Sequence, residues 1–211
     1  MKKVIFTLIL GLTISLSSIA QINKHNIGVF MGGGISSTSQ LLSNSMGYNI
    51  GLSYTYKINK RFAIITGLDY DRRGSYLNSD VQNISGNIQS YDFNNNFDFI
   101  SAPLLLNINI GNKVKYFVNT GVSLAYLISQ KQTTSIGGKT HVYYGKENFN
   151  KFEIDLNIGI GVLFPLSEKI DLSVEVKYKK GLTDIIKEHP FGGDKQTTSN
   201  ALLLLGLNYR L

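Results

Sequence analysis

The chain has 211 residues, with 21 Lys and Arg against 14 Asp and Glu, and it contains neither Cys nor Trp. This length suits one domain with a sizeable buried surface, and a chain without Cys cannot be a disulfide-stabilised scaffold. The formal net charge of +7 is scattered, and no Lys/Arg cluster is interleaved with aromatic residues, so we predict no nucleic-acid partner.

The N-terminus has the pattern of a secretory signal peptide. Lys2 and Lys3 precede an apolar run over residues 4–16, and "SLSSIAQ" supplies small residues before a cleavage site. We therefore predict a signal peptide over residues 1–20 and a mature domain over residues 21–211. Cleavage would remove two lysines and leave 19 basic and 14 acidic residues, a net charge of +5.

A single-span anchor over residues 4–19 is the alternative. This segment falls short of the roughly 20 residues that a spanning helix needs, and no charged stop-transfer flank follows it. Export with cleavage is therefore the favoured interpretation.

The mature chain alternates apolar and polar residues in long runs. Every even position from Tyr48 to Ile58 is apolar or aromatic, and after a short turn the alternation restarts at Phe62. Such runs exceed the roughly five or six residues of soluble strands and suit the roughly nine to eleven of a tilted membrane strand. The pattern predicts eight strands, over residues 26–34, 47–58, 62–74, 97–110, 116–128, 152–164, 170–178 and 201–211.

The fourth predicted strand, over residues 97–110, has a blurred pattern. Its run "SAPLLLNINIG" allows alternate residues from Leu104 to Ile110 to face outward. Pro103 cannot donate a ladder hydrogen bond, so we expect a bulge or a local break there.

The connections between these strands alternate in length. "NKR", "GNKVK" and "PLSEK" are short, whereas long polar loops are expected over residues 35–46, 77–95, 130–150 and 183–198. An even number of antiparallel strands with short periplasmic turns and long external loops is typical of outer-membrane barrels. We predict an all-β, eight-stranded antiparallel up-and-down transmembrane β-barrel, whose first and last strands pair because open edges are costly in hydrocarbon.

The two faces of the strands decide between a membrane barrel and a soluble barrel such as a lipocalin. The polar face combines glycines with charges of both signs, which suits a narrow interior filled by side chains, so we expect the apolar face to meet lipid. Two aromatic girdles are expected. Tyr54, Tyr56, Phe62, Tyr116, Phe164 and Tyr209 fall near the short-turn end, and Tyr48, Tyr70, Tyr126 and Phe152 near the loop end.

Nine charged residues share the inward parity and are candidates for interior ion pairs: Asp69, Asp71, Arg73, Glu153, Asp155, Glu175, Lys177, Lys179 and Arg210. Charges in a dry interior must pair. We expect Glu175, Lys177 and Arg210 to pair across the ladder, with Glu153 and Asp155 on the neighbouring strand also available. A pore lining is the alternative, but eight strands leave an interior just wide enough to be filled, which favours a closed plug.

The loops hold few signals for chemistry. "GGKT" fails as a phosphate-binding loop because Thr133 stands where the first Gly is required. His141 and His189 are accompanied in sequence by acidic residues that would suit a loop-based enzyme: Asp80, Glu147, Asp184, Glu188 and Asp194. The scattered His residues lack metal-ligand spacing, so we predict no catalytic, cofactor or metal site.

Four segments resemble the small PorT-like outer-membrane β-barrel family of Gram-negative bacteria: "GLDYDRRG" (67–74), "FISAPLLLNI" (99–108), "YKKGLTDI" (178–185) and the terminal "LLLLGLNYRL". The resemblance implies an eight-stranded barrel inserted by the outer-membrane assembly machinery. It implies no catalytic residues and no shared role, because most relatives have no assigned function.

Together these features predict a non-enzymatic outer-membrane protein with a plugged polar interior and no cofactor. Its expected partners are outer-membrane lipid, the assembly machinery, and an extracellular protein or glycan bound by the long loops, with a role in surface interaction or envelope integrity. The alternatives are a loop-based enzyme acting on lipid or peptide and a small pore or secretion assembly factor.

Overall fold

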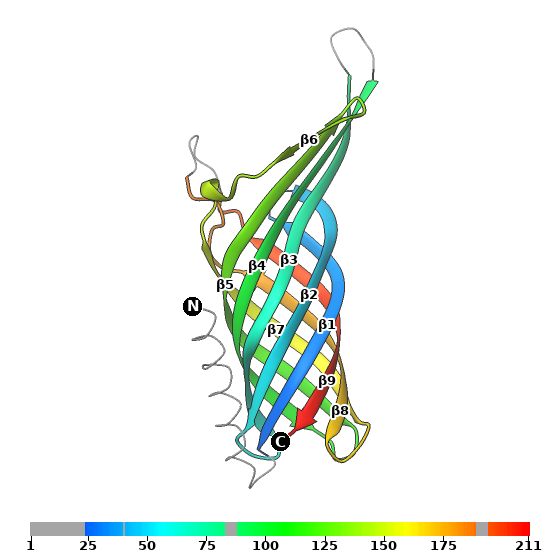
Figure 1. Ribbon diagram of the computed structural model, residues 1–211, viewed down its shortest axis with the longest axis vertical. Helices are drawn as coiled ribbons and strands as arrows, with labels where there is room; N and C mark the ends of the chain where they lie inside the picture. The colour runs from blue at the N-terminus through cyan, green and yellow to red at the C-terminus, as the bar shows by residue number, and fades with distance from the viewer. Residues whose placement is uncertain (1–23, 40, 83–87, 189–193) are drawn as a thin grey trace, which may run out of the picture.

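The computed structural model describes residues 24–39, 41–82, 88–188 and 194–211, so the expected signal peptide lies outside the described residues. The described chain forms one antiparallel sheet closed into a barrel (Figure 1). Its strands are β1 (His25–Thr38), β2 (Leu41–Lys57), β3 (Phe62–Gln82), β4 (Ile88–Ile110), β5 (Lys115–Ile136), β6 (Lys139–Tyr143), β7 (Phe152–Pro165), β8 (Ile170–Gly181) and β9 (Thr198–Arg210). Within this described part, no helix is long and apolar enough to span a membrane.

Eight of these strands form the closed ring, as predicted. Each pairs with its neighbour in the order β1, β2, β3, β4, β5, β7, β8, β9, and β9 pairs back with β1, where Leu207 lies opposite Val29. The short β6 pairs with the edge of β5 outside this ring. Closure leaves the ring without a free edge, which is the condition for a sheet in hydrocarbon.

Side-chain direction follows the predicted parity. Leu203 and Leu205 of β9 point outward and are 54% and 53% exposed, whereas Leu202 and Leu204 point into the barrel and are 1% and 2% exposed. Most of the predicted girdle residues are exposed on the outer face at the predicted ends: Tyr48, Tyr56, Phe62, Tyr116, Tyr126, Phe152, Phe164 and Tyr209. An apolar exterior of this extent requires a lipid environment rather than water.

Three of the four predicted long loops are mostly strand. β1 continues to Thr38 and β2 begins at Leu41, β3 and β4 pair up to Gln82 opposite Ile88, and β5 reaches Ile136. The loop prediction was wrong there because a sheet that leaves the barrel has no continuous apolar face, and the period-two signal is lost. In the fourth loop, the described residues 183–188 and 194–197 form no regular strand.

Pro103 lies inside β4, and pairing is interrupted nearby. Between β3 and β4, Leu104 pairs with Thr66 and Ser101 pairs with Asp69, but the two residues between Ser101 and Leu104 have no paired residue on β3. This interruption agrees with the predicted bulge or local break at Pro103. A separate register shift between β4 and β5 lies at Asp98/Phe99.

Candidate functional site: the filled barrel interior

Arg73 of β3 is the centre of the barrel interior. Its side chain is 0% exposed, and its guanidinium donates to both carboxylate oxygens of Asp155 at 2.7 Å and to Glu153 at 3.0 Å, both on β7. It also donates to Asp71 of its own strand at 2.9 Å. Because β4 and β5 separate β3 from β7 in the ring, the bonds to β7 cross the lumen instead of following the ladder.

Lys179 of β8 makes a second crossing. Its Nζ lies 3.1 Å from Asp69 Oδ2 and 2.8 Å from Asp71 Oδ2, and both carboxylates belong to β3. The ion cluster therefore comprises Asp69, Asp71, Arg73, Glu153, Asp155 and Lys179. Two cations face four carboxylates, which gives a formal charge of −2.

Neutral side chains supply further donors to the ion cluster. Asn49 donates to Asp69 at 2.6 Å, Asn200 to Asp71 at 2.9 Å, Thr198 to Glu153 at 3.0 Å and Ser123 to Asp155 at 3.0 Å. Every carboxylate of the cluster thus accepts hydrogen bonds from both a cation and a neutral donor. Buried charges are tolerated only when they are satisfied in this way.

The other three predicted residues lie nearer the short-turn end. Glu175 and Lys177 form a looser pair at 3.9 Å, and Glu175 also accepts from Asn119 at 2.9 Å. Arg210 pairs with Asp171 of β8, a residue that was not among the candidates.

The expected pairing of Arg210 with Glu175 is wrong because of their separation along the barrel. The register places Glu175 opposite Leu204, six residues from Arg210 on β9. At about 3.3 Å per residue these side chains start roughly 20 Å apart. The alternation of the sequence predicts that both side chains point inward, but it does not predict how far apart they lie along the barrel axis.

Two glycines make room for the interior carboxylates. A Cβ at Gly181 would lie 1.8 Å from Glu153 Oε1, and a Cβ at Gly159 would lie 2.0 Å from Glu175 Oε1. Glycine at these two inward positions is therefore a packing requirement, since Glu153 and Glu175 each occupy the space above a neighbouring glycine.

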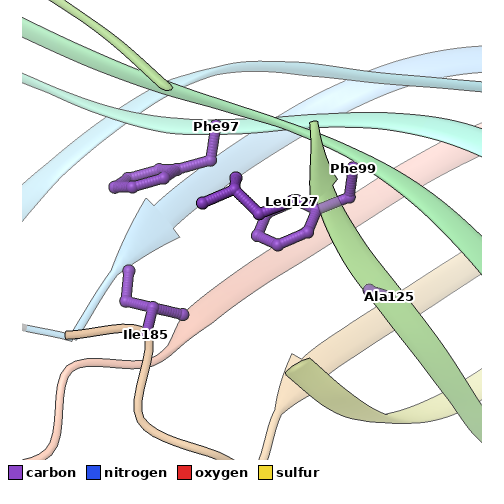
Figure 2. Close-up of a cluster of buried hydrophobic side chains, with 5 residues drawn as sticks. All are labelled: Phe97, Phe99, Ala125, Leu127 and Ile185. Carbon is purple, nitrogen blue, oxygen red and sulfur yellow. The ribbon is translucent and has the colours of Figure 1, made fainter. Parts of the chain in front are cut away.

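An apolar cap covers the ion cluster at the loop end, and the sequence analysis did not identify it. The cap consists of Phe97, Phe99, Ala125, Leu127 and Ile185. Figure 2 shows Ile185, on the segment after β8, facing the inward side chains of β4 and β5. The Arg73 guanidinium lies 4.8 Å from the centre of the Phe99 ring, so the cap contacts the cluster directly. The inward Phe residues are also why the fourth predicted strand was blurred.

Hydrogen bonds between two loops hold the cap in place. Asn150 Nδ2 donates to the carbonyls of Asp184 at 2.8 Å and Ile186 at 3.0 Å, and its backbone N–H donates to Ile185 at 2.8 Å. Phe149 pairs with Ile186 as an isolated β-bridge and stacks edge-on against Phe97, with centroids 5.0 Å apart. The mouth at the loop end is thus covered by ordered backbone.

This closed eight-stranded ring, apolar outside and polar inside, agrees with a family match over residues 10–187, described as outer membrane protein beta-barrel domain. The chain belongs to that outer-membrane family. The outer-membrane barrel is similar to Neisserial surface protein A (NspA), with a TM-score of 0.50 and 17% identity over 89% of this chain and 97% of that chain. This likeness shows the fold.

Two further solved barrels are similar at lower scores. OprG from Pseudomonas aeruginosa has a TM-score of 0.45 and 14% identity, covering 89% of this chain and 96% of that chain. Ail, the attachment invasion locus protein of Yersinia pestis, has a TM-score of 0.43 and 16% identity, covering 89% and 99%. No curated protein matches the sequence of this outer-membrane barrel.

The remaining candidate motifs, "GGKT" and the two histidines, belong to the loop end of the outer-membrane barrel. The two glycines of "GGKT" form the turn between β5 and β6, where Gly137 and Gly138 adopt φ of 55° and 79°, and Lys139 begins β6. His141 is exposed on β6 and stacks on Tyr143, while His189 lies outside the described residues. Among the residues that are described, no hydrogen bond or ion pair joins His141 to a carboxylate, and no group of three His, Cys, Asp or Glu is placed to hold a metal.

One carboxylate above the barrel has a perturbed pKa. Asp92 of β4 accepts hydrogen bonds from the Tyr76 hydroxyl and from Asn78 Nδ2, each at 2.6 Å. These bonds stabilise the ionised carboxylate and lower the pKa of Asp92, with the Tyr76 bond contributing most. The same bond raises the pKa of the Tyr76 hydroxyl. The two hydrogen bonds to Asp92 also connect β3 to β4 in the part of the sheet that extends beyond the barrel.

Proposed function

We propose that this outer-membrane protein is a non-enzymatic barrel that uses an external sheet to bind partners at the cell surface. The sheet extension consists of residues 76–82, 88–95, 130–136 and 139–143, from β3 to β6. It is the observation that carries the proposal. In Figure 1 these strands rise well beyond the rest of the barrel, and β6 lies at their edge.

The edge strand β6 gives the extension a surface suited to recognition. All five of its residues are exposed, and the aromatic pair Tyr143 and Tyr144 is 57% and 70% exposed. β6 pairs with β5 on one side, so the backbone of its other side faces away from the sheet. An exposed edge can take up an additional strand, and exposed aromatic residues add contact area.

The closed interior supports this function over a pore. The ion cluster bridges opposite walls of the barrel with bonds of 2.7 to 3.1 Å, and the apolar cap lies against it at the loop end. An eight-stranded barrel is narrow enough for side chains to fill its interior at this level. We therefore propose that the extension, rather than a transport path, contacts the ligand, an extracellular protein or glycan.

We also propose that the chain belongs to the PorT-like subgroup, is exported with cleavage of residues 1–20, and is inserted by the outer-membrane assembly machinery. The four resembling segments support the subgroup, and "GLDYDRRG" contributes Asp69, Asp71 and Arg73 to the ion cluster. The apolar run and the small residues before residue 21 support cleavage, which N-terminal sequencing of the purified protein would test.

Surface binding is tested with whole cells and arrays. Cells producing the protein are applied to immobilised extracellular proteins and glycans, and retention is compared with cells producing the double variant Tyr143→Ser, Tyr144→Ser. The matched control is Tyr91→Ser, which changes a tyrosine of the inner strand β4 instead of the edge. We expect loss of retention in the edge variant alone. Equal retention of all three would contradict the proposal.

The closed interior is tested separately in planar bilayers. We expect no stable ion-selective conductance from the wild type. A conductance that shifts when Glu175 or Lys177 is neutralised would make the pore the better assignment, because both line the interior near the short-turn end.

A further inference from the structure

The short-turn end of the barrel contains a cavity of about 710 Å³. This volume lies within the range of roughly 300 to 1,000 Å³ that is typical of small-ligand pockets. Each of the eight ring strands contributes to its wall, and the turn residues Asn59 and Asn112 lie at its mouth. Asn119 and Glu175 are its innermost residues on β5 and β8. The cavity is therefore a cup open to the periplasm.

A chain of amides lines one side of the cup. Asn109 donates to Asn107, Asn107 donates to Asn119 Oδ1 at 2.7 Å, and Asn119 donates to Glu175 at 2.9 Å. Successive amides held in fixed orientations present rigid donors and acceptors to whatever enters the cup. Such walls suit a ligand with many hydroxyl groups.

A buried acceptor on β1, away from the amides of β4 and β5, points to a donor on the ligand. Asn26 lines the cup and is 8% exposed, yet its Oδ1 has no hydrogen-bond partner among the described residues. Leaving a buried carbonyl unpaired is unfavourable, and most such groups in folded proteins are satisfied. Rotation of the Asn26 side chain toward the cup would bring this oxygen within reach of a hydroxyl or amide of a bound molecule.

The charge of the cup selects an anion. Lys24, Lys57, Lys60 and Lys115 all line it. Its two carboxylates each have a cationic partner: Asp171 pairs with Arg210, and Glu175 lies 3.9 Å from Lys177. Lys24, Lys60 and Lys115 therefore leave the cup with a net positive potential. Charge-assisted bonds from lysine to carboxylate or phosphate are strong.

From these observations we infer that the cup binds a small anionic carbohydrate, a sugar acid or a sugar phosphate, from the periplasm. The lysines at the wide end would bind the acidic group, and the amide wall with the Asn26 carbonyl would bind the hydroxyls. This site is at the opposite end of the barrel from the sheet extension and does not depend on the proposed surface function.

The test uses the full mature protein in lipid nanodiscs and titration calorimetry. The probes are glucuronate, glucose 6-phosphate, neutral glucose and inorganic phosphate. We expect saturable binding of at least one acidic sugar. Glucose, which lacks the acidic group, and inorganic phosphate, which lacks the sugar hydroxyls, should each bind with an affinity at least about tenfold lower.

Variants locate the binding. Lys115→Gln and, as a second reporter in another turn, Lys60→Gln should each weaken binding of the acidic sugar about tenfold. The matched control is Lys113→Gln, which changes a lysine in the same turn as Lys115 that does not line the cup. Heat-modifiable gel mobility confirms that each variant is folded.

Three results would overturn the inference. These are the absence of saturable binding by both acidic sugars, equal loss in Lys113→Gln and Lys115→Gln, and inorganic phosphate binding as tightly as glucose 6-phosphate. The last would reduce the cup to a simple anion site.

Discussion

Arg72 and Arg73 offer a matched test of the filled interior, because these neighbours in β3 point to opposite faces of the sheet. Arg73 is 0% exposed inside the barrel and bonds three carboxylates. Arg72 is on the outer side, 35% exposed, and pairs with Asp98 alone, at 2.6 Å. Replacing each by Met keeps an unbranched side chain and removes only the charge and its donors.

The expected costs differ because of what each change leaves behind. Arg73→Met changes the formal charge of the ion cluster from −2 to −3 and leaves Lys179 as its one cation. Removing one member of a buried pair costs about 3–5 kcal/mol. Arg72 is partly exposed, but the side chain of its partner Asp98 is only 11% exposed, so loss of this pair should cost more than the roughly 0–1 kcal/mol found for surface pairs. We expect Arg73→Met to lower the free energy of unfolding by about 1–4 kcal/mol more than Arg72→Met.

The assay is reversible urea unfolding of the protein in lipid vesicles, followed by heat-modifiable gel mobility and circular dichroism. A further variant adds Asp155→Asn to Arg73→Met, which restores the formal charge to −2. This double change should recover part of the loss. Equal costs for Arg72→Met and Arg73→Met, or no recovery in the double variant, would refute the reasoning from the ion cluster.

The outer face, the cap and the glycine packing give three further predictions. Leu205→Arg, on the lipid side, should destabilise by about 2–4 kcal/mol in the same unfolding assay, and inward Asn208→Ala should cost less; a reversed order would refute the facing. Ile185→Asp should speed hydrogen exchange over residues 182–188 without unfolding the barrel, as mass spectrometry would show. Gly181→Val should displace the Glu153 carboxylate and cost about 1–3 kcal/mol from overpacking, whereas unchanged stability would contradict the tight fit.

Strand number, facing and closure could be predicted from the sequence because lipid imposes a local rule. Each outward residue in the bilayer must be apolar, so the outward direction of Leu203 and Leu205 can be predicted without knowing which residues they contact. The inward parity of Asp69, Asp71 and Arg73 followed from the same alternation. These properties depend on the two-residue repeat of a strand and on nothing more distant in the chain.

Pairing inside the barrel required the tertiary structure. Arg73 bonds Glu153 and Asp155, 80 and 82 residues away, and Arg210 selects Asp171 because of axial position. Contacts between inward residues depend on strand register and on the width of the closed ring. The alternation of the sequence predicts neither of them.

The same reason explains the missed extension and cap. Above the membrane both faces of the sheet meet water, so β3 to β6 lose the apolar alternation that made the other strands visible. Ile185 belongs to a loop with no repeat at all, and it is buried because the closed ring brings Phe97, Phe99 and Leu127 beneath it. Alternation records what surrounds each residue locally, whereas contacts across a closed ring arise only when all eight strands are in place.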